Sequence, residues 1–446
     1  MDVAYQYQIA SHVRPGRLTL ATSGGVTEAG PALHPYFFRG FLTDPASAAQ
    51  ALLAVAAVAR ANYVAPLRTF TLDPVVTSNT DRLRFESFSG CCGVHARLDL
   101  LPAALDGEPA TSGTTNVDFN ADMRAALAGV VAGGSPMLMR VGTDEVTVTT
   151  ETTEVTERKV ELPKRWLKGF GEVQALNATM RQVAELDRAE ATRFIGALPR
   201  TSRRPLWATQ ANRALTLSTA PRPGAACISG PQRLAELRPL LRFATALRVY
   251  APEATPASLP MPSAWELDLV TARLTVTLSP DVFRGFSGEG ALLAALATGA
   301  SSADEDLLGV LLSWEPVLNP AALERNSGFP PERTRLTLSR LAASGRLGYD
   351  LRESGFFHRE LPFALDETAH PRLAGARALV AAGAVTVAGG GAIVGDGDGA
   401  GHRVTFTALE DTCTCPWWGK HRGTRGPCKH VLAARIVAAQ AGRATR

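Results

Sequence analysis

The sequence lacks a long uninterrupted hydrophobic stretch. Its longest strongly helical apolar run, 51–59, is far shorter than the roughly 20 residues that cross a bilayer. The run 378–394 is longer but is broken by four glycines. The N-terminus has neither the basic start nor the apolar core of an export signal. We therefore expect no membrane segment and a cytoplasmic location.

The sequence also contains few cysteines, and its net charge is low. The chain has six cysteines among 446 residues, and Cys91, Cys92 and Cys227 do not form the regular spacing of a disulfide framework. Formal net charge is only +4, with 46% hydrophobic and 20% charged residues, as in soluble globular proteins. At about 150 residues per domain, the length predicts two to four domains.

The other three cysteines lie in one short stretch near the C-terminus. Cys413 and Cys415 are two residues apart, and so are Cys428 and His430. Three thiolates and one imidazole are the ligands of a closed, structural zinc site. Cys413 and Cys415 would share one face of a strand, and the glycine-containing loop 416–427 can bring the two pairs together. The alternatives are a chance cluster of thiols or a redox pair at Cys413 and Cys415.

A Cys-x-Cys pair, twelve intervening residues and a Cys-x-His pair resemble the SWIM zinc finger, a small ββα module. The resemblance includes Pro416 after the second cysteine and the apolar helix residues Val431, Leu432 and Ile436. It implies one structural Zn²⁺ and a role in binding DNA or protein, and it does not imply catalysis.

Positive charge is concentrated around this finger. Residues 413–446 contain no Asp or Glu, whereas the other 412 residues carry 39 basic and 42 acidic side chains. Such a patch attracts a polyanion or an acidic protein face. The basic side chains of the finger are Lys420, Arg422, Arg425, Lys429, Arg435, Arg443 and Arg446, of which the first four are our candidates for contact with nucleic acid or a partner.

Hydrophobic periodicity predicts an α+β, multidomain protein. Residues 1–300 would form a mixed α+β body, with a possible internal boundary near 201–262. Within it we expect helices at 46–62, 121–131 and 233–242, a long helical stretch at 163–198, and strands at 81–88, 94–100, 137–141, 145–150, 265–269 and 273–278.

Residues 303–365 resemble a winged helix. The predicted order is three helices at 306–314, 319–328 and 331–345, then a hairpin of strands 347–351 and 356–361. On the third helix, Arg333 and Arg340 share a face with Leu336, opposite the predicted core. Two arginines there suit contact with phosphate or guanine, but a structural or protein-binding role fits the modest local charge equally well.

Residues 366–446 would form the zinc-finger module, with a helix at 371–382 and strands at 384–388 and 402–409 leading to the metal ligands. One possible catalytic motif lies elsewhere, where Cys91 and Cys92 precede His95. A Cys/His pair can form a nucleophile, but a free cysteine is more often a buried core residue. We therefore expect a non-enzymatic protein without a small-molecule substrate.

Two binding functions remain open from the sequence. The first is nucleic-acid binding by the basic finger, with the winged-helix-like domain as a second contact. The second follows from resemblance to bacterial SWIM proteins of this general layout, and implies an adapter that works with a MoxR-class AAA ATPase and a von Willebrand A protein. An enzyme that uses Cys91 or Cys92 as nucleophile is the least supported alternative.

Overall fold

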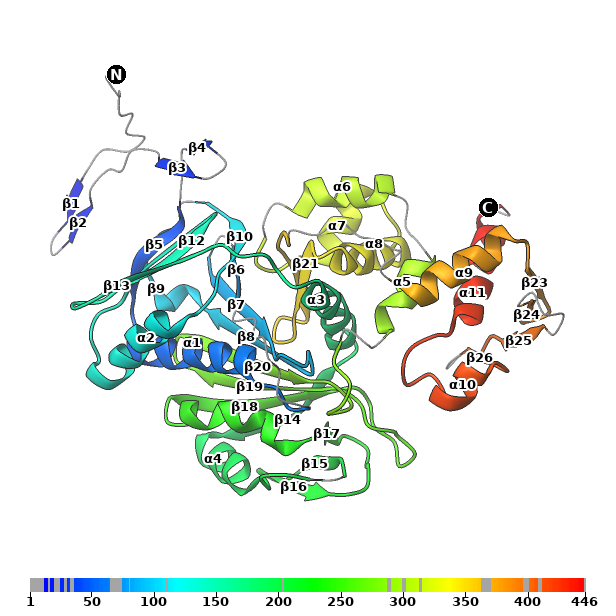
Figure 1. Ribbon diagram of the computed structural model, residues 1–446, viewed down its shortest axis with the longest axis horizontal. Coiled ribbons are helices and arrows are strands. Elements are labelled where there is room, and N and C mark those ends of the chain that lie inside the picture. The colour runs from blue at the N-terminus through cyan, green and yellow to red at the C-terminus, as the bar shows by residue number, and fades with distance from the viewer. Residues whose placement is uncertain are drawn as a thin grey trace.

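Figure 1 shows the computed structural model, which describes residues 12–14, 17–19, 25–27, 30–32, 36–64, 74–79, 81–109, 111–202, 204–286, 290–298, 302–312, 315–361, 370–395, 401–407 and 411–444. None of the helices within these ranges combines the length and the hydropathy that a bilayer crossing requires.

The described residues form the following elements. The helices are α1 (Pro45–Arg60), η1 (Pro102–Ala104), α2 (Ala121–Gly133), α3 (Lys164–Asn177), α4 (Arg188–Ala197), η2 (Pro231–Leu240), α5 (Ala291–Thr298), α6 (Ser302–Leu312), α7 (Pro320–Ser327), α8 (Pro331–Ala343), α9 (Pro371–Ala381), α10 (Pro416–His421) and α11 (Lys429–Ala444). The strands are β1 (His12–Arg14), β2 (Arg17–Thr19), β3 (Gly25–Thr27), β4 (Gly30–Ala32), β5 (Tyr36–Leu42), β6 (Val75–Ser78), β7 (Leu83–Phe88), β8 (Val94–Leu100), β9 (Leu105–Pro109), β10 (Gly113–Asn116), β11 (Leu138–Gly142), β12 (Glu145–Thr149), β13 (Glu154–Arg158), β14 (Arg181–Asp187), β15 (Leu206–Ala211), β16 (Ala214–Ser218), β17 (Ala226–Ile228), β18 (Ala244–Ala251), β19 (Ser263–Leu269), β20 (Ala272–Leu278), β21 (Leu347–Asp350), β22 (Gly355–His358), β23 (Val385–Ala388), β24 (Gly391–Val394), β25 (His402–Thr405) and β26 (Thr412–Cys413).

An eight-stranded antiparallel sheet organises the body. Its strand order is β10-β6-β7-β8-β20-β19-β18-β14. The pairing of β8 with β20 joins two halves that lie far apart in the chain, with Leu98 opposite Leu274. Because side chains alternate between the two faces of a strand, every second residue of β7, β8 and β20 points to the same side. The sheet therefore has two chemically different faces.

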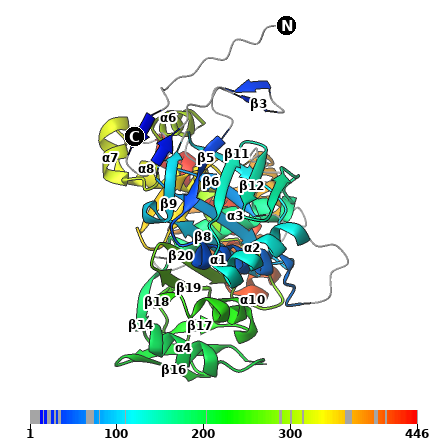
Figure 2. The ribbon, with the colours of Figure 1, turned by 90° about the vertical axis from the view of Figure 1, so that its left-hand side faces the viewer.

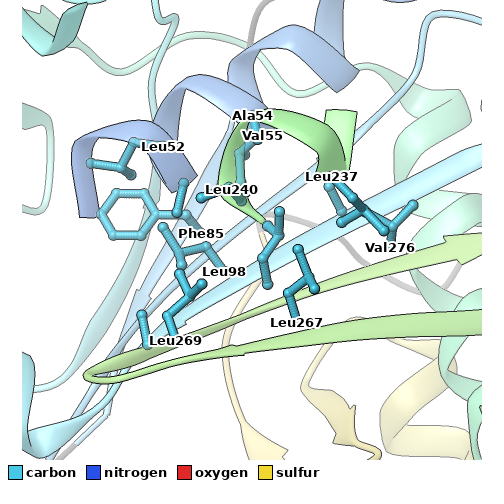
Figure 3. Close-up of a cluster of buried hydrophobic side chains, with 14 of the residues drawn as sticks. Leu52, Ala54, Val55, Phe85, Leu98, Leu237, Leu240, Leu267, Leu269 and Val276 are labelled. Carbon is cyan, nitrogen blue, oxygen red and sulfur yellow. The ribbon is translucent and has the colours of Figure 1, made fainter. Parts of the chain in front are cut away.

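One face of this sheet is apolar. Phe85, Leu98 and Leu267 lie in the main core with Val55 of α1 and Leu237 of η2, and all five side chains are completely buried. Figure 3 shows side chains from both helices meeting those of the sheet. Helix α1 begins with a favourable local pattern, since its N-cap Asp44 accepts the N–H of Ser47 and Pro45 follows in the first turn. Burial of this apolar face stabilises the body.

A second antiparallel sheet extends the same core. Its strand order is β13-β12-β11-β5-β9, and its inward residues include Phe38, Met139 and Val148. Helix α2 packs beside α1 (Figure 2). The mixed α+β character predicted for the body is therefore confirmed, as are α1, α2 and the strand pairs β7–β8, β11–β12 and β19–β20.

The opposite face of the eight-stranded sheet carries a buried layer of charge. The Nε atoms of Arg84 and Arg97 each lie 3.0 Å from a carboxylate oxygen of Asp99. Asp350, from the β21–β22 hairpin, lies 3.2 Å from Arg273. It also lies 3.5 Å from Arg84 and from Arg97. Burial alone would raise the pKa of Asp350, but these three arginines hold it below its usual range.

Helix α3 and the hairpin together cover this charged face. Arg359, just after β22, pairs with the buried Glu86 of β7. Beside this pair, the rings of Phe88 and Phe170 meet edge to face with centroids 4.9 Å apart. Trp166 of α3 joins them and is completely buried. The charged layer is thus closed off from water by aromatic side chains and by the hairpin.

Three helices and a hairpin follow in the predicted order, as α6, α7, α8, β21 and β22. On α8, Thr334, Leu338 and Leu341 lie on the face opposite Arg333 and Arg340, and all three side chains are buried. Helix α8 is packed against α3, α5, α6 and α7, so its C-terminal half is enclosed. The assignment of this unit as a winged helix, at 303–365, stays a prediction.

The long helical stretch predicted at 163–198 is wrong. The chain forms α3, then the strand β14, then α4. Strand β14 pairs with β18 at the edge of the eight-stranded sheet, with Leu186 opposite Leu247. The apolar spacing between Leu176 and Leu186 suits a helix, but pairing with a distant strand overrides this local preference. The predicted helix at 233–242 forms as the 3-10 helix η2.

Helix α5 connects the body with the C-terminal part of the chain. Its side chains Leu292, Leu293 and Leu296 lie in one core with Leu432 of α11, and α5 also contacts α3 and α8 (Figure 1). In region 201–262, strands β15, β16 and β17 form a separate small sheet. The three-part division of the chain and the possible boundary within 201–262 stay predictions.

Because the buried arginines depend on Asp350, we expect removal of its negative charge to destabilise the protein strongly. Asp350→Asn would leave Arg84, Arg97 and Arg273 short of a buried negative charge, and breaking such a pair costs about 3–5 kcal/mol. We expect a markedly lower urea midpoint of the full chain, followed by tryptophan fluorescence.

A matched control is Glu253→Gln, which removes an exposed carboxylate that lies 2.9 Å from Arg181. Solvent screens that pair, so its loss should leave the midpoint unchanged. Equal urea midpoints for Asp350→Asn and the wild type would contradict the proposed contribution of these buried ion pairs to stability.

Candidate metal centre

Three short elements position the four predicted ligands. Cys413 ends β26, and Cys415 is the N-cap of α10, where its Sγ accepts the N–H of Trp418 at 3.4 Å. Cys428 and His430 lie at the start of α11. All four side chains are buried, and their ligand atoms lie within 4.8 Å of one another. The structure therefore brings together every predicted metal ligand.

The geometry fits a tetrahedral zinc ion. Sγ of Cys413 lies 3.9 Å from Nδ1 of His430. With Zn–S of about 2.3 Å and Zn–N of about 2.0 Å, neighbouring tetrahedral ligands are about 3.5–3.8 Å apart. The other ring nitrogen of His430, Nε2, is buried without a hydrogen-bond partner among the described residues. A set of four buried donors with no open position is typical of a structural site.

The three clustered thiols affect one another's ionisation. Hydrogen bonding with Cys413 lowers the pKa of Cys428 to about 4, against the effect of burial. The same hydrogen bond, together with burial, raises the pKa of Cys413, and burial raises the pKa of Cys415. One thiolate is thus stabilised at the expense of its neighbours, and a divalent ion would relieve this competition. The residues fit one structural Zn²⁺.

A small apolar core supports the ligands. Strands β23, β24, β25 and β26 form an antiparallel sheet, in which Val404 pairs with Cys413. Val404 and Leu432 are completely or almost completely buried, as is Leu373 of α9. The predicted helix at 371–382 and strand at 384–388 are confirmed as α9 and β23, and the predicted strand at 402–409 is confirmed over 402–405. Residues 408–410 lie outside the described part of the chain.

The basic side chains of the finger differ in availability. Lys420, Arg422 and Lys429 are exposed, and Arg425 is half-buried. Arg435 lies 2.6 Å from Asp411, an acidic residue just before the ligand stretch. Among the side chains that the structure describes within 413–446, the exposed positive charge is therefore carried by the loop between the two ligand pairs and by the first residue of α11. Use of these side chains in binding stays a prediction.

Two arginines from outside the finger lie near the cationic loop and add to its positive charge. Burial lowers the pKa of His421, and so do the nearby cations Arg425, Lys420, Arg284 and Arg372. Arg284 follows β20, and Arg372 is on α9. Sequence reasoning missed both, because their distance along the chain leaves no local pattern that links them to the finger.

The loop between the ligand pairs is docked on the rest of the protein through its backbone. Nη1 of Arg372 donates to the carbonyl oxygens of Arg425 and Pro427. Nη2 of Arg284 donates to the carbonyl oxygen of Thr424 at 3.4 Å. At Gly426, which has a φ of 67°, a side chain would collide with the backbone of Gly290. Positions 424–427 are thus held by contacts with Arg284, Gly290 and Arg372.

The two arginines predicted to face nucleic acid from α8 contact carboxylates. Arg333 makes two bonds to Asp304, at 2.6 and 2.8 Å, and its guanidinium stacks 4.1 Å from the ring centroid of Phe329. Arg340 Nε lies 2.5 Å from Glu305. The acidic run at the start of α6 was visible in the sequence, but its alignment with α8 was not. A nucleic-acid contact by these arginines stays a prediction.

The possible catalytic motif does not assemble into a nucleophile with its base in hydrogen-bonding position. Nε2 of His95 lies 3.3 Å from Glu86, and the imidazole belongs to the buried charged layer. Burial, opposed by Glu86, lowers the pKa of His95. Sγ of the half-buried Cys91 lies 3.4 Å from Ser89 Oγ, and Cys92 is buried in an apolar cluster.

One part of the chain, the zinc finger, matches a known protein family. Residues 402–436 match the SWIM zinc finger family, which confirms the resemblance drawn from the ligand spacing. No curated protein sequence matches the chain.

Similar solved structures include proteins titled proliferating cellular nuclear antigen or PCNA. The proliferating cellular nuclear antigen of Entamoeba histolytica is 10% identical with a TM-score of 0.36, and the match covers 55% of this chain and 98% of that one. The PCNA2-PCNA3 complex of Sulfolobus tokodaii is 10% identical with a TM-score of 0.38, covering 55% of this chain and 99% of that one. At these identities and TM-scores the likeness carries no functional inference.

The four ligands predict that each chain binds one zinc ion. We expect the ion to be lost when one thiolate is removed. Cys428→Ser should reduce the zinc content to near zero, measured by mass spectrometry after gel filtration. At such sites the apparent zinc affinity is about 10–16 kcal/mol, and much of it is also folding free energy. The C-terminal module should therefore become sensitive to protease while the body stays intact.

The control is Cys91→Ser, which changes a half-buried thiol outside the cluster and should retain a full zinc ion. A Cys428→Ser protein that keeps stoichiometric zinc would contradict the four-ligand site.

Proposed function

We propose that the protein is a zinc-dependent, non-enzymatic binding protein whose SWIM-type finger contacts nucleic acid. The observation that carries this proposal is the set of exposed cations on the loop between the zinc ligands, including Lys420 and Arg422. Arg284 and Arg372 add positive charge from the body and from α9. A fixed basic patch of this kind attracts the phosphate backbone.

The finger is the primary contact in this proposal, with the helical unit of α6, α7 and α8 in a secondary role. Arg333 and Arg340 would have to leave Asp304 and Glu305 before they could bind phosphate. By contrast, Lys420, Arg422 and Lys429 are already exposed to solvent. Less rearrangement is therefore needed for contact through the finger.

A binding role without catalysis also fits the two cysteines of the β7–β8 turn. A nucleophilic cysteine needs an activating base within hydrogen-bonding reach. The only histidine of that motif, His95, is directed at Glu86 and is 2% exposed. We therefore assign no catalytic residue.

Removal of two loop charges should weaken nucleic-acid binding and reduce its salt dependence. In Lys420→Gln/Arg422→Gln, the slope of log affinity against log salt should fall by about 0.7–0.9 for each phosphate that the variant no longer neutralises. Fluorescence anisotropy of labelled DNA and RNA, at increasing KCl with the zinc-loaded protein, measures both effects.

The matched control is Arg181→Gln/Arg193→Gln, which removes the same charge from exposed side chains of β14 and α4, away from the finger (Figure 1). It should bind like the wild type. Absence of binding by the zinc-loaded wild type at low salt would overturn the proposal.

A second candidate function is that of a protein adapter, and a separate surface favours it. On α6, Leu307 and Val310 are 43% and 78% exposed and lie three residues apart on one helix face. Exposed apolar residues at this spacing suit docking on another protein. The partner we propose for this function is a MoxR-class AAA ATPase acting with a von Willebrand A protein.

Val310→Asp tests the adapter function. If this face docks on the purified ATPase, a charge placed there without a partner should weaken the complex about tenfold or more, measured by biolayer interferometry. Val270→Asp, at the β19–β20 turn and 72% exposed, is the control and should bind normally. Equal binding of both variants, or no binding by the wild type, would exclude docking through α6.

A further inference from the structure

A cleft of about 620 Å³ lies where the zinc loop meets the body. The body contributes most of its lining, including Tyr63, Arg204, Gln232 and the segment 280–284. The loop between the zinc ligands contributes Thr424. Because the loop runs from Cys415 to Cys428, the metal ligands at its two ends help to position the part of the cleft that Thr424 lines.

An exposed aromatic ring lies at the edge of this cleft. Phe283 is 79% exposed, the highest fraction for any large hydrophobic side chain among the described residues. Its backbone is nevertheless fixed. The N–H of Phe283 donates to Oδ1 of Asp281 at 2.9 Å, and the N–H of Phe286 donates to the carbonyl of Cys92 at 2.7 Å. At Gly285, a side chain would collide with the backbone of Cys91. The ring is thus presented to solvent by an ordered turn.

Two arginines line the same cleft as this ring. Arg284, the next residue, extends toward the zinc loop and donates to the carbonyl of Thr424. Arg204 lines the cleft from the body. Asp281 is the one acidic group that lines the cleft among the described residues, and its carboxylate already accepts the N–H of Phe283. The surroundings favour an anionic ligand with a flat, apolar group.

We propose that this cleft binds single-stranded nucleic acid, with an unpaired base stacked on Phe283 and the adjoining phosphates held by Arg284, Arg204 and the loop cations. Aromatic stacking combined with a basic groove is the usual way proteins hold single strands, whereas paired bases in a duplex are not available to such a ring. This inference rests on the proposed nucleic-acid binding and specifies the ligand as single-stranded.

The same features argue against an acidic protein segment as the main ligand. Carboxylates would satisfy the arginines but would leave the exposed ring and the apolar Leu259, which is 54% exposed, without a partner. A nucleotide supplies both the anion and the flat ring. A poly-glutamate peptide is therefore included in the test as the probe for an acidic protein segment.

The experiment measures binding of a labelled oligothymidylate of about 15 nucleotides and of a duplex to the zinc-loaded full chain. Phe283→Ala should weaken single-strand binding by about 5- to 150-fold, because one stacked base is lost, while duplex affinity and the salt slope stay the same. Phe283→Trp should restore binding. Phe41→Ala, at a ring 49% exposed on β5, is the matched control and should have no effect.

The outcomes separate this inference from the function on which it rests. If Phe283→Ala binds single strands like the wild type while Lys420→Gln/Arg422→Gln is weakened, the cleft proposal is wrong and the basic finger remains a nucleic-acid contact. If the wild type binds neither strand nor duplex, both proposals fail. If poly-glutamate binds in a Phe283-dependent way and the oligonucleotide does not, the cleft takes an acidic protein segment.

Discussion

Charges buried at the centre of this protein must be paired, and that constraint determines how its parts are joined. Strands β7, β8 and β20 direct Arg84, Arg97 and Arg273 toward a face closed off from water. Asp99 neutralises part of this charge from within the sheet, and Asp350 and Glu353 add negative charge from the hairpin. An unpaired ion there would be strongly destabilising. The hairpin is continuous with α8, α8 packs on α5, and α5 packs on α11, so the pairing also places the zinc module.

The metal site has a second structural consequence beyond holding the finger together. Its two ligand pairs bracket a loop whose backbone is bound by Arg284 and Arg372 and is in close contact with Gly290. These contacts use neutral carbonyl groups, so they hold the loop without consuming its exposed positive charges. The metal ligands, the loop between them and the edge of the cleft that Thr424 lines are therefore connected through the backbone.

The basic side chains of the finger and those of α8 differ in how they are paired. On the finger, the acidic residue closest to the ligands, Asp411, pairs with Arg435 and leaves the loop cations exposed. On α8, Arg333 and Arg340 each have a carboxylate of α6 within bonding distance. Charge available to a ligand is what remains after such pairs form, and the pairs depend on which helices pack together.

The sequence by itself determined the zinc ligands, because ligand type and spacing are local properties, and it determined the helices and hairpins whose periodicity is strong, such as α1 and β19–β20. Tertiary structure alone decided that β14 is a strand, that β8 pairs with β20, and that Asp350 lies among buried arginines. It also decided that Phe283 and Thr424 border one cleft. Each of these depends on contacts between segments far apart in the chain, and the register of such contacts follows from packing that no local pattern encodes.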